Sequence, residues 1–130
     1  MFGFLKAKNC DYHVNQMVKC SEAAIKYFHR ADEYLAGSGF GDGNVKVQSA
    51  KGALMKGQKK LKEALWNYKD GVKDMDSNSD YDKQGLAIGA MKFNPASAYQ
   101  FESEEVMDLW ERDTEWLQSE FKKIFDYESI

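Results

Sequence analysis

A heptad pattern between Asn44 and Met75 constrains the fold more than any other feature of this sequence. Large side chains recur every seven residues at Val47, Leu54, Leu61, Tyr68 and Met75. Small residues recur with the same period, three positions later, at Ala50, Gly57, Ala64 and Gly71. This spacing predicts a helix with one apolar seam. Each glycine costs a helix about 1 kcal/mol relative to alanine. The regular placement of Gly57 and Gly71 therefore predicts a structural use for them, which is the close packing of a second helix against this seam.

The partner helix is predicted immediately upstream, from a cap at Asn9 or Asp11 to about Ala36. Its inward positions alternate in steps of four and three: Cys10, Val14, Met17, Ser21, Ala24, Phe28, Ala31 and Leu35. Four glycines in the seven residues 37–43 predict a hairpin loop. We therefore expect residues 9–75 to form a close-packed antiparallel hairpin in which facing residue numbers sum to about 81, so that Ala24 lies beside Gly57. Residues 1–8 are expected to form an N-terminal tail.

The rest of the chain predicts one short helix and a third long helix. A polar loop over 76–82 precedes a helix from Tyr81 to Phe93, which must end before Pro95. Residues 94–102 are expected to be irregular, with Tyr99 and Phe101 inserted into the core. Ser103 is the expected cap of a last helix that runs to about Tyr127. The prediction is all-α: one domain over 1–130, an up-and-down bundle of three long helices plus one short helix.

A repeat architecture is the alternative fold. At an offset of forty residues, Ala24, Phe28 and Ala31 map onto Ala64, Tyr68 and Gly71. This spacing is similar to the second helix of a tetratricopeptide-type repeat. No third copy appears, and stacked repeats need several units to bury their faces, so the bundle is preferred.

Composition indicates the compartment. The chain has 130 residues, 43% hydrophobic and 30% charged, which suits one compact domain. The apolar opening with Phe2, Phe4 and Leu5 is too short for a secretion signal or a membrane span and small for an interfacial anchor. Cys10 and Cys20 are separated by about 15 Å of helix and cannot bridge within it. We expect a cytoplasmic protein with free thiols and no membrane association.

Catalytic and metal-binding motifs are missing from the sequence. Neither His13 nor His29 follows a glutamate by three residues, as di-iron bundles require. Cys10 and His13 are one turn apart, but further zinc ligands are lacking. The glycine loop lacks the ending of a phosphate-binding P-loop. We expect no catalysis, metal or cofactor. The enzyme alternative is a carboxylate-based reaction that uses Glu111 and Asp113 in one deep pocket.

Charge is unevenly divided along the chain. Residues 44–75 carry eight lysines against three acidic residues, and residues 76–130 carry five basic against thirteen acidic residues. At 100° per residue, one helix face gathers what we name the lysine face: Lys51, Lys59, Lys62, Lys69 and Lys73. Steps of four, three and four place an acidic stripe on the last helix: Glu104, Asp108, Glu111 and Glu115. The simplest interpretation is two solvated faces that partly neutralise each other across the bundle.

Each charged surface also has a functional interpretation. The lysine face can bind nucleic acid or phosphate, but the net charge of −3 and the lack of arginine and interleaved aromatic residues on this face argue against nucleic acid. The acidic stripe can dock a basic partner. Asp113 projects between apolar positions, where an unpaired carboxylate is costly. We expect it to be partnered within the chain or to reach water, with a partner's cation as the alternative.

Aromatic residues exceed what a small bundle can bury. There are seven Tyr, eight Phe and three Trp. We expect some of Tyr27, Tyr34, Trp66 and Trp116 to contact another chain, because surface aromatics are enriched at interfaces. The function expected from the sequence is a protein-binding module, in the manner of an adaptor, immunity protein, chaperone or phage-type inhibitor. Its partner is another protein or a second copy of the chain.

Overall fold

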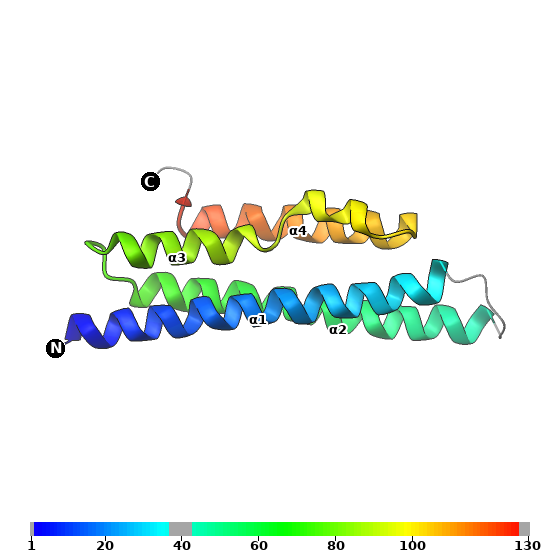
Figure 1. Ribbon diagram of the computed structural model, residues 1–130, viewed down its shortest axis with the longest axis horizontal. Coiled ribbons are helices and arrows are strands. Elements are labelled where there is room, and N and C mark those ends of the chain that lie inside the picture. Colours follow the sequence, from blue (N-terminus) through cyan, green and yellow to red (C-terminus); the bar gives the residue numbers. More distant parts are fainter. Residues whose placement is uncertain (1, 37–42, 128–130) are drawn as a thin grey trace.

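The computed structural model describes the backbone of residues 2–36 and 43–127, and the side chains of residues 9–36 and 45–127. This part of the chain is an all-α bundle without strands (Figure 1). Its elements are α1 (Phe2–Ala36), α2 (Gly43–Asp74), α3 (Asp80–Met91), the 3-10 helix η1 (Pro95–Gln100) and α4 (Glu104–Ile124). The predicted bundle of three long helices and one short helix is confirmed. Among the described residues, no helix could cross a membrane.

The hairpin of α1 and α2 forms around the predicted seam. An added Cβ on Gly57 would lie 2.7 Å from the ring of Phe28, and one on Gly71 would lie 3.3 Å from the Cβ of His13. A Cβ at Gly57 would force the Phe28 ring to shift, and one at Gly71 would be a tight contact, so both glycines suit the close approach. The nearest atoms to Gly57 belong to Phe28 and Tyr27 rather than to Ala24, because long helical side chains lean towards the N-terminus of their own helix.

Several predicted boundaries were wrong. Helix α1 begins at Phe2, so residues 2–8 are not a tail. Helix α2 is unbroken from Gly43, which excludes the repeat alternative for this segment; the rest of the predicted loop, residues 37–42, lies outside the described residues. The loop at 76–82 ends at Ser79, whose side chain caps α3 by accepting from the N–H of Asp82. Helix α3 therefore spans Asp80–Met91 instead of the predicted Tyr81 to Phe93.

The second layer consists of α3, η1 and α4, which lie on one side of the hairpin (Figure 1). Two groups of buried aromatic rings hold it there. Near η1, Phe28 of α1 packs edge-on against Trp110 of α4, with ring centroids 5.0 Å apart, and Phe101 contacts both. Farther along, Phe121 of α4 contacts Tyr68 of α2 and Phe93. The apolar positions of α4 therefore face the hairpin, which leaves its polar positions towards solvent.

The segment between α3 and α4 is more regular than predicted. Pro95–Gln100 form η1 instead of an irregular segment, and the side chain of Asn94 caps it by accepting from the N–H of Ala96. Phe101 is 3% exposed, as expected for a core residue, but Tyr99 is 82% exposed. The prediction of Tyr99 as a core residue was wrong because the 3-10 turn directs Ala98 inward in its place.

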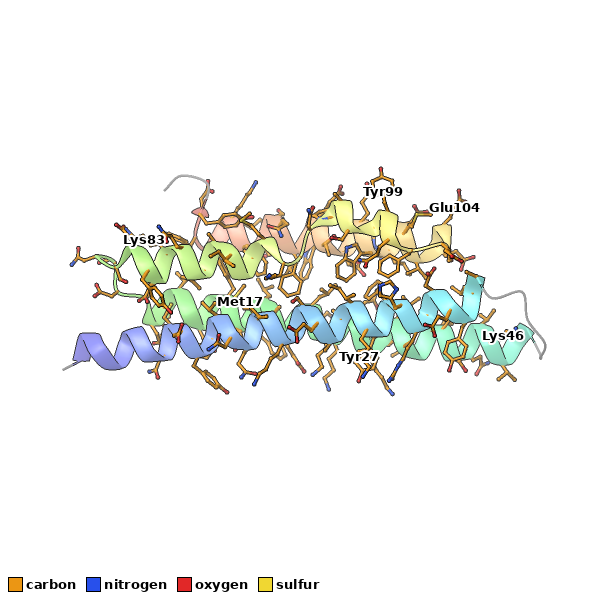
Figure 2. The ribbon with its side chains drawn as sticks, viewed as in Figure 1. Met17, Tyr27, Lys46, Lys83, Tyr99 and Glu104 are labelled. Carbon is orange, nitrogen blue, oxygen red and sulfur yellow. The ribbon has the colours of Figure 1, made fainter. Side chains whose placement is uncertain are left out.

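The start of α4 is held by a residue on α1. Ser103 occupies the cap position but makes no side-chain cap hydrogen bond. Instead, the buried carboxylate of Asp32 accepts from the N–H groups of Glu102 and Ser103, the latter at 2.7 Å. A carboxylate at a helix N-terminus is favourable both for the free N–H groups and for the helix dipole. Asp32 thereby connects α1 to the start of α4, which Glu104 marks in Figure 2.

Candidate functional site

A groove of about 410 Å³ lies between α2 and α4. The two helices run in the same direction along the bundle (Figure 1). Leu61 is 2% exposed and supplies apolar floor, whereas Trp116 is 44% exposed. We name this feature the α2–α4 groove and define it by the residues that line it: Gln58, Leu61, Lys62, Arg112, Asp113 and Trp116.

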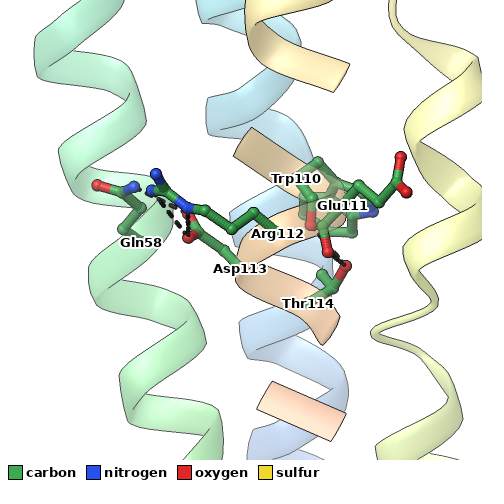
Figure 3. A network of polar contacts seen from close by, with 6 residues as sticks. All are labelled: Gln58, Trp110, Glu111, Arg112, Asp113 and Thr114. Atoms are coloured by element: carbon green, nitrogen blue, oxygen red, sulfur yellow. Dashed lines mark hydrogen bonds and ion pairs between the residues drawn. The ribbon is translucent and has the colours of Figure 1, made fainter. Parts of the chain in front are cut away.

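A polar network joins the two helices at the groove. The amide of Gln58 donates to one carboxylate oxygen of Asp113 at 2.8 Å, and the guanidinium of Arg112 donates two bonds of 3.2 Å to the other oxygen (Figure 3). The side chain of Asp113 is 17% exposed and that of Arg112 is 67% exposed. Asp113 is therefore partnered within the chain, as expected, and its charge is balanced by the neighbouring arginine.

The lysine face is fully presented to solvent. Lys51, Lys59, Lys62, Lys69 and Lys73 are all exposed. None of them forms an ion pair with another residue in the described ranges. Lys62 is the member that also lines the α2–α4 groove. The lysine face thus carries uncommitted positive charge up to the edge of the groove.

The prediction that the lysine face lacks interleaved aromatic residues was wrong, whereas α2 contains no arginine, as expected. Trp66 follows Lys62 by one turn, falls in the same arc at 100° per residue and is 63% exposed. Met55 lies in this arc too and is 69% exposed. Arg112 reaches the groove from α4. The position of Trp66 could have been found from its spacing, but that of Arg112 depends on how the helices pack.

The acidic stripe faces away from the groove. Glu104, Asp108, Glu111 and Glu115 are exposed, and in the described structure none pairs with a member of the lysine face. Figure 3 shows Glu111 and Asp113 leaving α4 on different sides. Both faces are solvated, as expected, and no direct ion pair joins them within the described residues, because α4 meets α2 through its apolar positions and Asp113. The two carboxylates of the enzyme alternative are also not brought together in the groove.

The four aromatic candidates lie on different parts of the surface. Trp116 lines the groove and Trp66 lies one turn from Lys62, whereas Tyr27 and Tyr34 belong to α1. Tyr34 is 44% exposed, and the half-buried Tyr27 ring lies 5.5 Å from the guanidinium of Arg30. Further exposed apolar side chains were not singled out from the sequence: Tyr12, Tyr81, Ile88 and Met91.

The two thiols are buried, and His13 forms a hydrogen bond within the bundle. Burial, followed by the charges of nearby aspartates, raises the pKa of Cys10 from 9.0 to about 12. Burial also raises the pKa of Cys20. Protonated thiols are poor nucleophiles and poor metal ligands. His13 bonds the side chain of Asn67 at 2.9 Å. Within the described residues, no three His, Cys, Asp or Glu side chains are grouped to hold a metal ion.

Fold and groove together define a small helical bundle with an amphipathic surface groove between two parallel helices. Comparisons with family models, with curated proteins and with solved structures found no significant match to this chain. Function is therefore inferred from the groove and its surroundings alone.

Proposed function

We propose that this protein is a protein-binding module that docks a segment of another protein in the α2–α4 groove. One observation carries the proposal: the exposed side chain of Trp116 lines the same groove as the buried side chain of Leu61 and the cationic side chains of Lys62 and Arg112. Tryptophan and arginine are the side chains most enriched among residues that dominate binding energy. Adaptors, immunity proteins, chaperones and inhibitors of a cytoplasmic partner all fall within this proposal.

Hydrogen bonds between helices support the groove, which favours binding. Gln58 and Asp113 connect α2 to α4, and Asp32 of α1 positions the start of α4. Side chains on packed helices lose little freedom when a partner arrives, so more of the contact energy remains as affinity. Nothing in this arrangement calls for catalysis, and the proposal includes none.

Capture of the partner with matched variants tests this function. The tagged protein is expressed in its native cell as wild type, as Trp116→Ala and as Glu111→Gln, whose side chain leaves α4 away from the groove. We expect a stoichiometric partner with the wild type and with Glu111→Gln, and its loss with Trp116→Ala. Equal retention by all three forms would contradict the proposal. If the retained partner is a second copy, sedimentation of the pure protein must show a dimer that Trp116→Ala dissociates.

Nucleic-acid binding is a second candidate because Trp66 lies within the lysine face. Exposed aromatic rings among cations can stack on unpaired bases while the cations neutralise phosphates. This candidate predicts salt-sensitive retention on single-stranded DNA that falls when Lys59, Lys62 and Lys69 are reversed to Glu. Retention that is absent, or unchanged in the reversed variant, would exclude it.

A further inference from the structure

We infer that the segment docked in the α2–α4 groove is an acidic amphipathic helix. This inference rests on the proposed function and names the chemistry of the partner. It follows from the charge at the rim of the groove, the apolar surface within it and the direction of the two helices that form it.

The rim of the groove is cationic on both sides. Lys62 on α2 makes no ion pair in the described part of the chain, and the Arg112 side chain on α4 is 67% exposed. Lys59 and Lys69 extend the positive surface along α2 and are exposed as well. Arg112 is paired with Asp113, so the net positive charge at the rim comes from Lys62 and continues through Lys59 and Lys69. Carboxylates placed above this surface would gain complementary contacts, whereas lysine or arginine side chains would be repelled.

Negative charge near the groove is already balanced. Asp113 is the carboxylate that lines it, and both of its oxygens accept hydrogen bonds, one from Gln58 and the other from Arg112. The acidic stripe lies elsewhere on α4, as the position of Glu111 shows (Figure 3). Among the residues that line the groove, an acidic segment would therefore face no unbalanced carboxylate.

Apolar surface in the groove requires an amphipathic partner. Trp116 and Leu61 provide apolar contact area between the cations. Trp66 and Met55 continue the exposed apolar surface on α2. A chain of acidic residues alone would leave these side chains uncovered. A segment with apolar residues on one side and carboxylates on the flanks would cover both kinds of surface.

The form of the groove favours a helix over an extended strand. The groove lies between two helices that run in the same direction, and a third helix can lay its apolar face into such a depression. The groove spans Gln58 to Lys62 on α2, a rise of about 6 Å, and the exposed Trp66 and Lys69 lie farther along the same helix. A docked helix of about three turns would reach from Gln58 to Lys69. An extended segment needs an open sheet edge for its backbone hydrogen bonds, and the described residues contain no strand.

A displayed peptide library tests the inference without knowledge of the natural partner. Random segments of sixteen residues are selected on immobilised wild-type protein, and the enriched segments are re-tested on Trp116→Ala. We expect enriched segments to lose binding on Trp116→Ala, to carry excess Asp and Glu, and to place apolar residues at intervals of three and four. Circular dichroism should show that they become helical when bound.

Charge reversal provides the matched control. Lys62→Glu should weaken an enriched peptide at least about tenfold, since rim charges contribute to partner choice. Lys26→Glu, an exposed reversal on α1, makes the same change in net charge and should leave affinity within about twofold. Trp116-dependent peptides without excess acid, or equal effects of the two reversals, would overturn the inference and leave the proposed groove standing. Enrichment with no dependence on Trp116 would overturn both.

Discussion

The side-chain amide of Gln58 on α2 donates a 2.8 Å hydrogen bond to the carboxylate of Asp113 on α4, across a separation of 55 residues in sequence. The same carboxylate accepts two bonds from Arg112. This contact fixes the distance between the helices that border the groove. It also converts an acid on the apolar side of α4 from a destabilising group into a structural one.

Removal of this carboxylate should destabilise the bundle. Asp113→Ala leaves the half-buried amide of Gln58 without its acceptor, so we expect the free energy of unfolding to fall by about 1–2 kcal/mol. Glu111→Ala, two residues away and exposed, should change it by less than about 0.5 kcal/mol. Urea unfolding followed by circular dichroism measures both. Equal stability of the two variants would show that the Gln58–Asp113 contact contributes nothing to the fold.

The two glycines of α2 at positions 52 and 57 should respond in opposite ways to alanine. Gly52 has no atom within 4 Å of an added Cβ, so Gly52→Ala should stabilise the helix by about 0.5–1 kcal/mol. In Gly57→Ala the new Cβ would lie 2.7 Å from the fully buried ring of Phe28. The ring must shift, and we expect a net loss of about 1–2 kcal/mol.

Thermal unfolding of the two glycine variants separates these effects. A lower melting temperature for Gly57→Ala and a higher one for Gly52→Ala are expected. Stabilisation by both changes would mean that α1 and α2 are not in close contact at Gly57.

Asp32 should control the start of α4. Asp32→Ala removes the acceptor for the N–H groups of Glu102 and Ser103, so a cost of about 1–3 kcal/mol is expected. Hydrogen exchange should quicken at the first turn of α4 more than at the centre of the α1–α2 hairpin. Glu33→Ala, at the adjacent exposed position, serves as the control. Unchanged exchange at Ser103 in Asp32→Ala would contradict this role.

Stability should fall at alkaline pH because Cys10 is buried. Its pKa rises from 9.0 to about 12 in the folded chain, mainly through burial and then through Asp82, Asp11 and Asp74. The unfolded thiol loses its proton near pH 9 while the folded one keeps it. The neutral buried thiol contributes its full share of the free energy of unfolding below pH 9. As pH rises from 9 towards 12, this share should fall by up to about 1.4 kcal/mol per pH unit. Burial also raises the pKa of Tyr68 and adds a loss of the same sign above pH 10.

Urea unfolding of wild type and Cys10→Ala at pH 8 and pH 10.5 tests the contribution of the thiol. Cys10→Ala should be less stable at pH 8 because it leaves a small cavity. Its stability should nevertheless fall less between the two pH values. An equal fall in the free energy of unfolding of both proteins between the two pH values would show that Cys10 is not the source of the alkaline loss.

Much of the fold could be predicted because the heptad seam is a local pattern. Leu61, Tyr68 and Ala64 are buried where the seam places them, although Val47 at its start is 41% exposed. The start of α1 was missed because Asn9 and Asp11 favour helix caps but can also lie within a helix. The exposed Tyr99 and the cap from Asp32 could not be predicted, since both depend on a 3-10 turn and on contacts about 70 residues apart.

Individual residues of the candidate site were predicted from the sequence, but their grouping in one groove was not. Lys62, Asp113 and Trp116 were each singled out, but on three separate surfaces. The structure brings them together in one groove with Gln58 and Arg112, neither of which has a distinguishing local pattern. Only the packing of α4 against α2 reveals them. Trp66, in contrast, could have been assigned to the lysine face from its four-residue spacing to Lys62.

Site-specific photo-crosslinking in the native cell tests the central claim most directly. A photoreactive phenylalanine analogue is placed at position 116 in the groove, at position 111 on the acidic stripe or at position 99 on η1. The proposed function predicts one discrete crosslinked product from position 116, which Lys62→Glu reduces, and little from the other two positions. Absence of a product from position 116, or equal products from all three, would contradict the claim that the α2–α4 groove binds a protein partner.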